Sequence, residues 1–162
     1  MPLPAPSLKG RALRLLGMRE HSRAELERKL KRHEEEPGQL AEALDQLQSK
    51  GFISEQRVLD SVLHSRLAKF GAARIKQELQ GKGLDPAMVK ATVAQLQASE
   101  FERARLIWSR KFSAQGDFAS PPRIMERAER ARQMRFLAAR GFGADTIRRV
   151  FNQVEESELP DD

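Results

Sequence analysis

The sequence contains no cysteine and no tyrosine, and it has a single tryptophan. The lack of cysteine excludes disulfides, thiolate nucleophiles and thiolate metal sites. No stretch approaches the roughly eighteen consecutive apolar residues that a membrane-spanning helix needs, and the amino end lacks the apolar core of a signal peptide. We therefore expect a cytoplasmic protein that makes no contact with a membrane.

The motifs of common catalytic and metal sites are also missing. Neither a glycine-rich phosphate loop nor a Gly-x-Ser-x-Gly nucleophile motif occurs in the sequence. The histidines, His21, His33 and His64, fall in different predicted helices without a second ligand at helical spacing. His21 and His33 are expected at the surface. We expect a protein that is not an enzyme and that uses no cofactor or metal.

The composition is typical of an all-α protein. Arg, Glu, Leu, Ala and Gln are abundant, charged residues make up 32% of the chain, and no run alternates β-branched with polar residues. Hydrophobic residues at 40% can form a core, although only 6% of the chain is aromatic. Helices are therefore expected throughout.

The sequence repeats itself at two offsets. A shift of 49 positions aligns residues 25–47 with residues 74–96, and a further shift of 58 places Gly83 and Leu84 on Gly141 and Phe142. Each of these glycines can close a helix in the left-handed conformation. In the second unit, an Asp-Pro pair then starts the next helix. In the first unit Pro37 aligns with Pro86, the proline of this pair, but no glycine aligns with Gly83.

These offsets predict a tandem array of three three-helix repeats, elongated and curved, because units this small must share apolar surface with their neighbours. The predicted parts are a disordered amino terminus over residues 1–7, repeats over 8–53, 54–100 and 101–154, and an acidic tail over 155–162.

Local signals place several helices within this array. A first helix over about 8–20 should turn Leu13 and Leu16 inward, and Ser22 with Glu25 forms a capping box for the next helix. Ser54 is expected to cap a helix over 55–69. A loop over 113–122 should precede a long helix over 121–140. Core positions are predicted for these aromatic residues: Phe52, Phe70, Phe101, Phe142 and Phe151.

Charge is distributed unevenly along the chain, whose net charge is +6. Residues 1–33 carry nine Lys and Arg against three acids, and residues 103–149 carry twelve against four. The part between them is mildly acidic. Two basic blocks of this kind favour a polyanion or an acidic protein face as partner, although arginine also makes good solvated helix surface.

The candidate interface consists of basic side chains at helical spacing away from the apolar positions. Contacts of such residues with several phosphates would give salt-sensitive binding that is indifferent to base sequence. The candidate residues are Arg11, Arg14, Arg28, Lys31, Arg66, Lys69, Arg74, Lys76, Arg127, Arg130, Arg135, Arg140, Arg148 and Arg149.

Four stretches in this order resemble the RecX family of bacterial regulatory proteins. They are "ALRLLGMREHSRAELERKL" (12–30), "SKGFISEQRVLDSVLHSR" (49–66), "GAARIKQELQGKGL" (71–84) and "RFLAARGFGADTIRRV" (135–150). The resemblance extends over residues 8–154. One departure is Val58-Leu59-Asp60, where the family usually shows an aromatic residue, a small residue and Glu.

The resemblance implies a modulator built of three-helix repeats that takes part in recombination, DNA repair and the SOS response. Such proteins bind the RecA recombinase filament on single-stranded DNA, reduce its ATPase and strand-exchange activity, and favour its disassembly. The basic blocks predict weak, non-specific contact with single-stranded DNA, and we expect a monomer. The residues alone leave an alternative open, a general helical DNA-binding protein or small transcription regulator.

Overall fold

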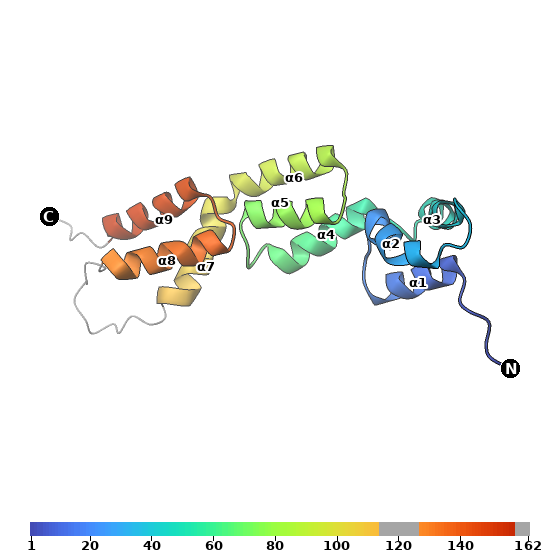
Figure 1. The fold of residues 1–162 in the computed structure, drawn as a ribbon. Helices are drawn as coiled ribbons and strands as arrows, with labels where there is room; N and C mark the ends of the chain where they lie inside the picture. The colour runs from blue at the N-terminus through green and yellow to red at the C-terminus, as the bar shows by residue number, and fades with distance from the viewer. Residues whose placement is uncertain (114–126, 158–162) are drawn as a thin grey trace. The chain divides into compact units, whose positions relative to one another are not determined.

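The computed structural model describes residues 1–113 and 127–157, with side chains described as far as residue 153. Within these residues the chain forms nine α-helices, one short 3-10 helix and no strand (Figure 1), which confirms the all-α prediction. The helices are α1 (Leu8–Met18), α2 (Arg23–Leu30), η1 (Lys31–His33), α3 (Gln39–Ser49), α4 (Glu55–Arg66), α5 (Ala72–Gly81), α6 (Pro86–Ala98), α7 (Glu100–Phe112), α8 (Arg127–Ala139) and α9 (Ala144–Ser157).

The predicted helix starts are confirmed by their hydrogen bonds. In the capping box, the Glu25 amide donates to Ser22 Oγ at 3.1 Å, and the Ser22 amide donates to the Glu25 carboxylate at 2.9 Å. Ser54 Oγ caps α4 by accepting from the Arg57 amide at 3.2 Å. The α4 helix ends at Arg66 rather than at the predicted residue 69. The predicted loop after residue 113 and the predicted helix start at 121 lie outside the described residues.

The two glycine closures are also confirmed, whereas the role given to Pro37 is wrong. Gly83 and Gly141 have φ angles of 69° and 86°, in the left-handed region. Helix α3 begins at Gln39, so Pro37 lies in the preceding turn and not at the first helical position. The cause is Glu34, whose carboxylate accepts from the amides of Gly38 at 3.1 Å and Leu40 at 3.2 Å and so caps α3 from outside.

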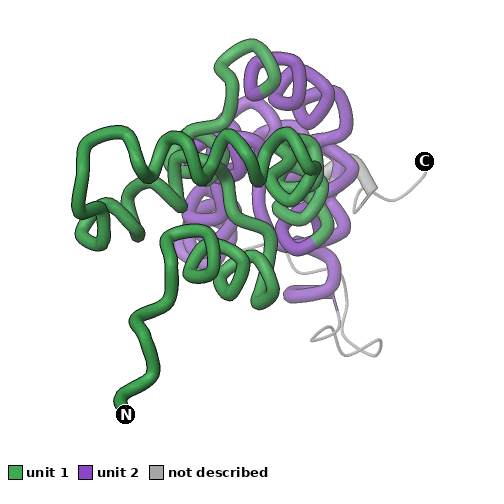
Figure 2. Tube along the Cα trace, turned by 90° about the vertical axis from the view of Figure 1, so that its right-hand side faces the viewer, with its two compact units in different colours: residues 1–64, 78–88 green, residues 65–77, 89–162 purple. Residues whose placement is uncertain are grey.

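The chain divides into two compact units, shown in different colours in Figure 2. Unit 1 comprises residues 1–64 and 78–88, and unit 2 comprises residues 65–77 with the described residues from 89 onward. The division therefore runs through the predicted middle repeat. Each unit has its own apolar cluster, which contains Ala12, Leu26, Leu30, Leu40, Leu44, Leu47 and Ile53 in unit 1, and Ala104, Ile107, Leu137, Phe142, Ile147, Val150 and Phe151 in unit 2.

Two predicted core residues lie at the surface instead. Leu13 is 37% exposed because the inward position of α1 is occupied by Ala12, which is fully buried. Phe52 is 48% exposed, and the next residue, Ile53, is buried in its place. The remaining predicted aromatic residues are either buried, as Phe142 and Phe151 are, or partly buried, as Phe70 and Phe101 are.

In unit 1 the start of α2 packs against the turn that joins α5 to α6. Ser22 Oγ donates a hydrogen bond to the Lys82 carbonyl, and the Arg28 guanidinium donates to the Gly81 carbonyl at 2.9 Å. The backbone of Gly83 comes so close that a Cβ there would lie 2.6 Å from the Ala24 Cβ.

In unit 2 the start of α5 packs against the turn that joins α8 to α9. The Gly71 amide donates to the Arg140 carbonyl at 2.7 Å, and the Ala73 amide donates to the Gly141 carbonyl at 3.2 Å. The Arg74 guanidinium donates to the Ala139 carbonyl at 3.3 Å. The same arrangement thus occurs twice: α2 packs against the α5–α6 turn, and α5 packs against the α8–α9 turn. Each of these contacts lies within one compact unit. This explains why the boundary between the two units runs through the predicted middle repeat.

An ionic cluster around the buried Glu25 supports the docking in unit 1. The Glu25 carboxylate accepts from Arg19 at 2.9 Å and from Lys82 Nζ at 3.2 Å. Burial acts to raise the pKa of Glu25, but the hydrogen bonds from Arg19, the Ser22 amide and Lys82 outweigh it and lower that pKa to about 2. Glu25 therefore stays ionised in the folded protein over the whole physiological range.

The predicted surface position of His21 is wrong, because this side chain is only 2% exposed. Its Nδ1 lies 3.0 Å from the Arg19 carbonyl, which can accept only if Nδ1 carries a proton, and its Nε2 lies 3.4 Å from Lys29 Nζ. Burial lowers the pKa of His21, with the Arg19 guanidinium acting in the same direction. The neutral imidazole is therefore part of the core of unit 1.

Candidate functional site

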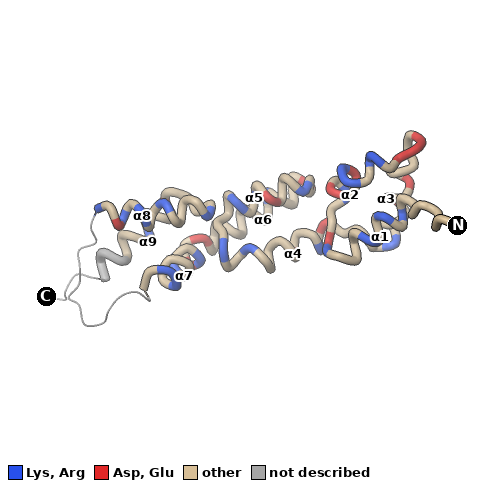
Figure 3. The backbone as a smooth tube through the Cα atoms, turned by 60° about the horizontal axis from the view of Figure 1, so that its bottom comes forward, with Lys and Arg blue, Asp and Glu red and all other residues tan. Residues whose placement is uncertain are grey.

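Lys and Arg are distributed over α1, α2, α7 and α8 (Figure 3). Among the described residues, most ion pairs join side chains on one helix or on neighbouring turns, as in Arg105–Glu102 and Arg132–Glu129. No group of three or more His, Asp or Glu residues in the described part of the chain is placed to hold a metal ion. None of the described helices is long and apolar enough to cross a membrane. The candidate site is therefore formed by described cations that lack acidic partners.

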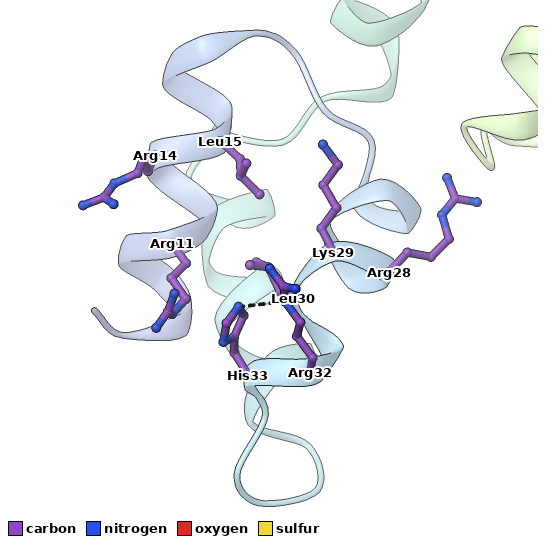
Figure 4. A pocket seen from close by; sticks show the side chains of 8 residues that line it. All are labelled: Arg11, Arg14, Leu15, Arg28, Lys29, Leu30, Arg32 and His33. Atoms are coloured by element: carbon purple, nitrogen blue, oxygen red, sulfur yellow. Dashed lines mark hydrogen bonds between the residues drawn. The ribbon is translucent and has the colours of Figure 1, made fainter. Parts of the chain in front are cut away.

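Five such cations surround a pocket of 470 Å³ in unit 1, which we call the α1–α2 pocket. It is lined by Arg11, Arg14, Leu15, Arg28, Lys29, Leu30, Arg32 and His33 (Figure 4). In Figure 4 the Arg11 side chain points toward His33, whereas Arg14 and Arg28 extend outward at opposite sides. None of the lining cations forms an ion pair within the described residues.

The polar contacts inside this pocket are made with neutral groups. Arg11 Nε donates to the Pro6 carbonyl at 3.2 Å, and Arg32 Nε donates to His33 Nε2 at 3.2 Å. His33 is partly buried, and this desolvation together with the charges of Arg11 and Arg32 lowers its pKa. At neutral pH the pocket therefore presents guanidinium and ammonium groups around a neutral imidazole.

A second pocket lies in unit 2 and has a volume of 390 Å³; we call it the Phe70–Phe136 pocket. It is lined by Ala68, Lys69, Phe70, Ile107, Arg110, Lys111, Phe136 and Arg140. The guanidinium carbon of Arg140 lies 4.3 Å from the centre of the Phe136 ring, and that of Arg74 lies 4.2 Å from the centre of the Phe70 ring. The lining of this pocket therefore combines two aromatic rings with four basic side chains.

The structure brings some of the predicted candidates together and gives others a packing or pairing contact. Arg11, Arg14 and Arg28 line the α1–α2 pocket, and Lys69 and Arg140 line the Phe70–Phe136 pocket.

The other candidates lie outside both pockets. Lys31 pairs with Glu34 and Arg148 with Asp145, while aromatic rings lie beneath Arg66 and Arg74 (Phe70), Arg130 (Phe151) and Arg149 (Phe101). The exposed candidates Lys76, Arg127 and Arg135 line neither pocket.

Four lining cations were not among the sequence candidates: Lys29, Arg32, Arg110 and Lys111. Arg110 and Lys111 have no acidic residue three or four positions away, a signal in the sequence that could have marked them. Lys29 has Glu25 four positions before it, but that carboxylate is bound by Arg19 and Lys82 instead. The sequence alone could not show that Lys29 is left without an acidic partner.

Comparison with known proteins accounts for this architecture. A family model described as "RecX, first three-helix domain" matches residues 9–47, and one described as "RecX, third three-helix domain" matches residues 98–151. A regulatory protein RecX from Leptothrix cholodnii is 47% identical over 147 residues, which cover 91% of this chain and 88% of the relative. The chain belongs to the RecX family.

Further comparisons agree with this assignment and confirm the resemblance found in the sequence. A regulatory protein RecX from Ralstonia nicotianae is 43% identical, and the match covers 93% of this chain and 89% of the relative. The crystal structure of RecX from Lactobacillus salivarius superimposes with a TM-score of 0.70 at 18% identity, covering 92% of this chain and 95% of the other. That likeness supports the RecX fold of tandem three-helix domains.

Proposed function

We propose that this member of the RecX family binds the RecA filament on single-stranded DNA as a cytoplasmic monomer. In this role it inhibits the ATPase and strand-exchange activities of the filament and favours its disassembly. Family membership supports the regulatory class of function. The observation that carries the binding mode is the pair of pockets whose cations have no acidic partners within the described residues. Such cations are available to phosphates or to carboxylates of a partner.

The direct test is a titration of this protein into RecA assembled on single-stranded DNA with ATP. ATP turnover is expected to fall at amounts near or below one molecule per RecA protomer. Unchanged turnover across a broad titration at low salt would contradict the proposal. Protection of one defined duplex sequence, with weaker binding to single strands, would instead favour a general DNA-binding protein.

A variant can test whether the Phe70–Phe136 pocket takes part. Lys69, Arg110 and Lys111 are exposed residues of its lining, so changing all three to Gln removes charge without disturbing the apolar cluster of unit 2. If they contact the phosphates of a single strand, the slope of log affinity against log salt should weaken by about 2, because each lost contact removes about 0.7.

The matched control removes the same charge elsewhere in unit 2. Arg105 and Arg132 pair with neighbouring acids on their own helices, and Lys90 is an exposed residue of α6. The Gln variant of these three should inhibit RecA as the unmodified protein does. If both triple variants lose inhibition equally, net charge rather than the pocket is responsible, and the assignment of this pocket fails.

A further inference from the structure

The α1–α2 pocket has a charge arrangement that folding alone does not explain. Like charges held close together destabilise a folded protein, and in this pocket Arg11, Arg14, Arg28, Lys29 and Arg32 surround a common space. The acidic side chains nearest in sequence are engaged elsewhere: Glu27 pairs with Arg23, and Glu34 is bound by Lys31 and by the amides of Gly38 and Leu40. Within the described residues the positive charge of the pocket is therefore not neutralised by the protein.

We propose that the α1–α2 pocket binds a phosphate group together with the sugar attached to it. This inference rests on the proposed function and adds a specific ligand site to it. Arginine side chains suit the group because their planar forks match phosphate oxygens, and an ammonium adds a point charge. The ligand could be a phosphate within a strand or one at a strand end or on a free nucleotide.

The size and lining of the pocket favour a ligand larger than an inorganic ion. At 470 Å³ the space falls within the range of about 300–1,000 Å³ typical of small-molecule sites. Leu15 and Leu30 supply an apolar wall beside the cations. Arg11 and Arg32 flank His33, and Lys29 projects from α2 (Figure 4). The phosphate is thus assigned to the space beside His33, and the sugar to the leucine wall.

Binding of a phosphate in this pocket is coupled to protonation of His33. Its Nε2 accepts a hydrogen bond from Arg32, so the imidazole is neutral and protonation of Nε2 would release Arg32 Nε for the ligand. The charged groups that surround it are Arg11 and Arg14 from α1, Arg28 and Lys29 from α2, and Arg32 beside it. A bound anion offsets these charges and favours the imidazolium. Phosphate affinity should therefore rise as the pH falls through the pKa of His33.

The experiment follows the histidine ring resonances of the full-length protein by NMR from pH 5 to 8. Sulfate serves as the first probe, because it stays dianionic over this range, so any pH dependence belongs to the protein. The expected result is a saturable shift of the His33 resonance and a higher pKa of His33 in saturating sulfate. A rise of one unit corresponds to about a tenfold gain in affinity across the titration. His64 on α4 serves as an internal control for non-specific anion effects.

Variants and further probes complete the test. Changing Arg11 and Arg32 to Gln should abolish the saturable shift, whereas changing the acid-paired Arg105 and Arg132 should leave it unchanged. Thymidine 5′-monophosphate and oligothymidylates with and without a 5′-phosphate distinguish the source: equal affinity of the two oligonucleotides indicates an internal phosphate, and preference for the phosphorylated one a terminal phosphate.

Two outcomes would overturn the inference. One is a His33 pKa that sulfate and the nucleotides leave unchanged, and the other is an effect that is equal in both double variants. Neither outcome depends on RecA, so inhibition of the filament could persist while the phosphate site is refuted. The two proposals therefore fail separately.

Discussion

Changing Gly71 to Ala should destabilise unit 2 by disrupting the docking of α5 on the α8–α9 turn. A Cβ at this position would lie 2.3 Å from the Gly141 carbonyl oxygen and 2.5 Å from the Phe142 amide nitrogen. Because both atoms belong to the backbone, no side-chain rotation can relieve the overlap. The two segments would have to separate by about 1 Å to reach ordinary contact distances.

Such a separation would break the hydrogen bonds from the Gly71 amide at 2.7 Å and from the Ala73 amide at 3.2 Å. Each bond contributes about 1 kcal/mol and overpacking costs about 1–3 kcal/mol, so the expected loss of unfolding free energy is about 3–5 kcal/mol. For a chain of this length that corresponds to a fall in Tm of roughly 6–20 °C.

Urea unfolding followed by tryptophan fluorescence measures this effect where it arises. The single tryptophan, Trp108, lies in unit 2, where its indole NH donates to Gln133 at 2.7 Å. The matched control is Gly17→Ala within α1, where a Cβ would meet nothing within 4 Å. This change should raise the stability of unit 1 by about 0.5–1 kcal/mol, measured by urea unfolding followed by far-UV circular dichroism. If Gly71→Ala unfolds within about 0.5 kcal/mol of the unmodified protein, the docking described for unit 2 is wrong.

Three further predictions concern unit 1 and the two cores. The pKa of Glu25 is about 2 in the folded protein against 4.5 for the free group, so ionised Glu25 contributes about 3 kcal/mol to the unfolding free energy. This contribution is present above pH 4.5 and is lost as the pH falls toward 2. In Glu25→Gln, the stability measured by circular dichroism should therefore depend less on pH over this range. Leu79→Asp should unfold the region around α5, because Leu79 is fully buried and the carboxylate would have no partner, and far-UV circular dichroism would report the lost helix. Phe142→Ala should cost about 3–5 kcal/mol and Phe52→Ala less than about 1 kcal/mol in urea titrations, since only the first ring is buried; similar losses would contradict the exposure of Phe52.

The features that sequence predicted correctly are those set by neighbouring residues. The capping box at Ser22 and the glycine closures at Gly83 and Gly141 depend on side chains and backbone angles within a few positions, so the printed sequence contains their cause. The prediction that α3 begins at Pro37 was wrong because Glu34 caps α3 from outside the helix. The aligned units contain no equivalent of this cap.

The features that sequence could not predict depend on distant partners. Whether a cation is available for a ligand depends on which acids reach it, and the pairs Arg23–Asp45 and Arg57–Glu20 join residues 22 and 37 positions apart in the chain. The same limit applies to Lys29, whose neighbouring carboxylate is bound by Lys82 from another helix triplet. The basic character of the surface was therefore predictable, but the composition of each pocket was not.

The two docked turns have a consequence for synthesis on the ribosome. The acceptor of the Ser22 hydroxyl, the Lys82 carbonyl, lies sixty residues later in the chain. The acceptor of the Gly71 amide, the Arg140 carbonyl, also lies far along the chain. While the nascent chain is shorter than this, α2 can form but lacks the turn that receives it. Unit 1 is therefore expected to acquire full protection against proteolysis only after residue 83 has emerged from the exit tunnel, well after α1, α2 and α3 have been translated.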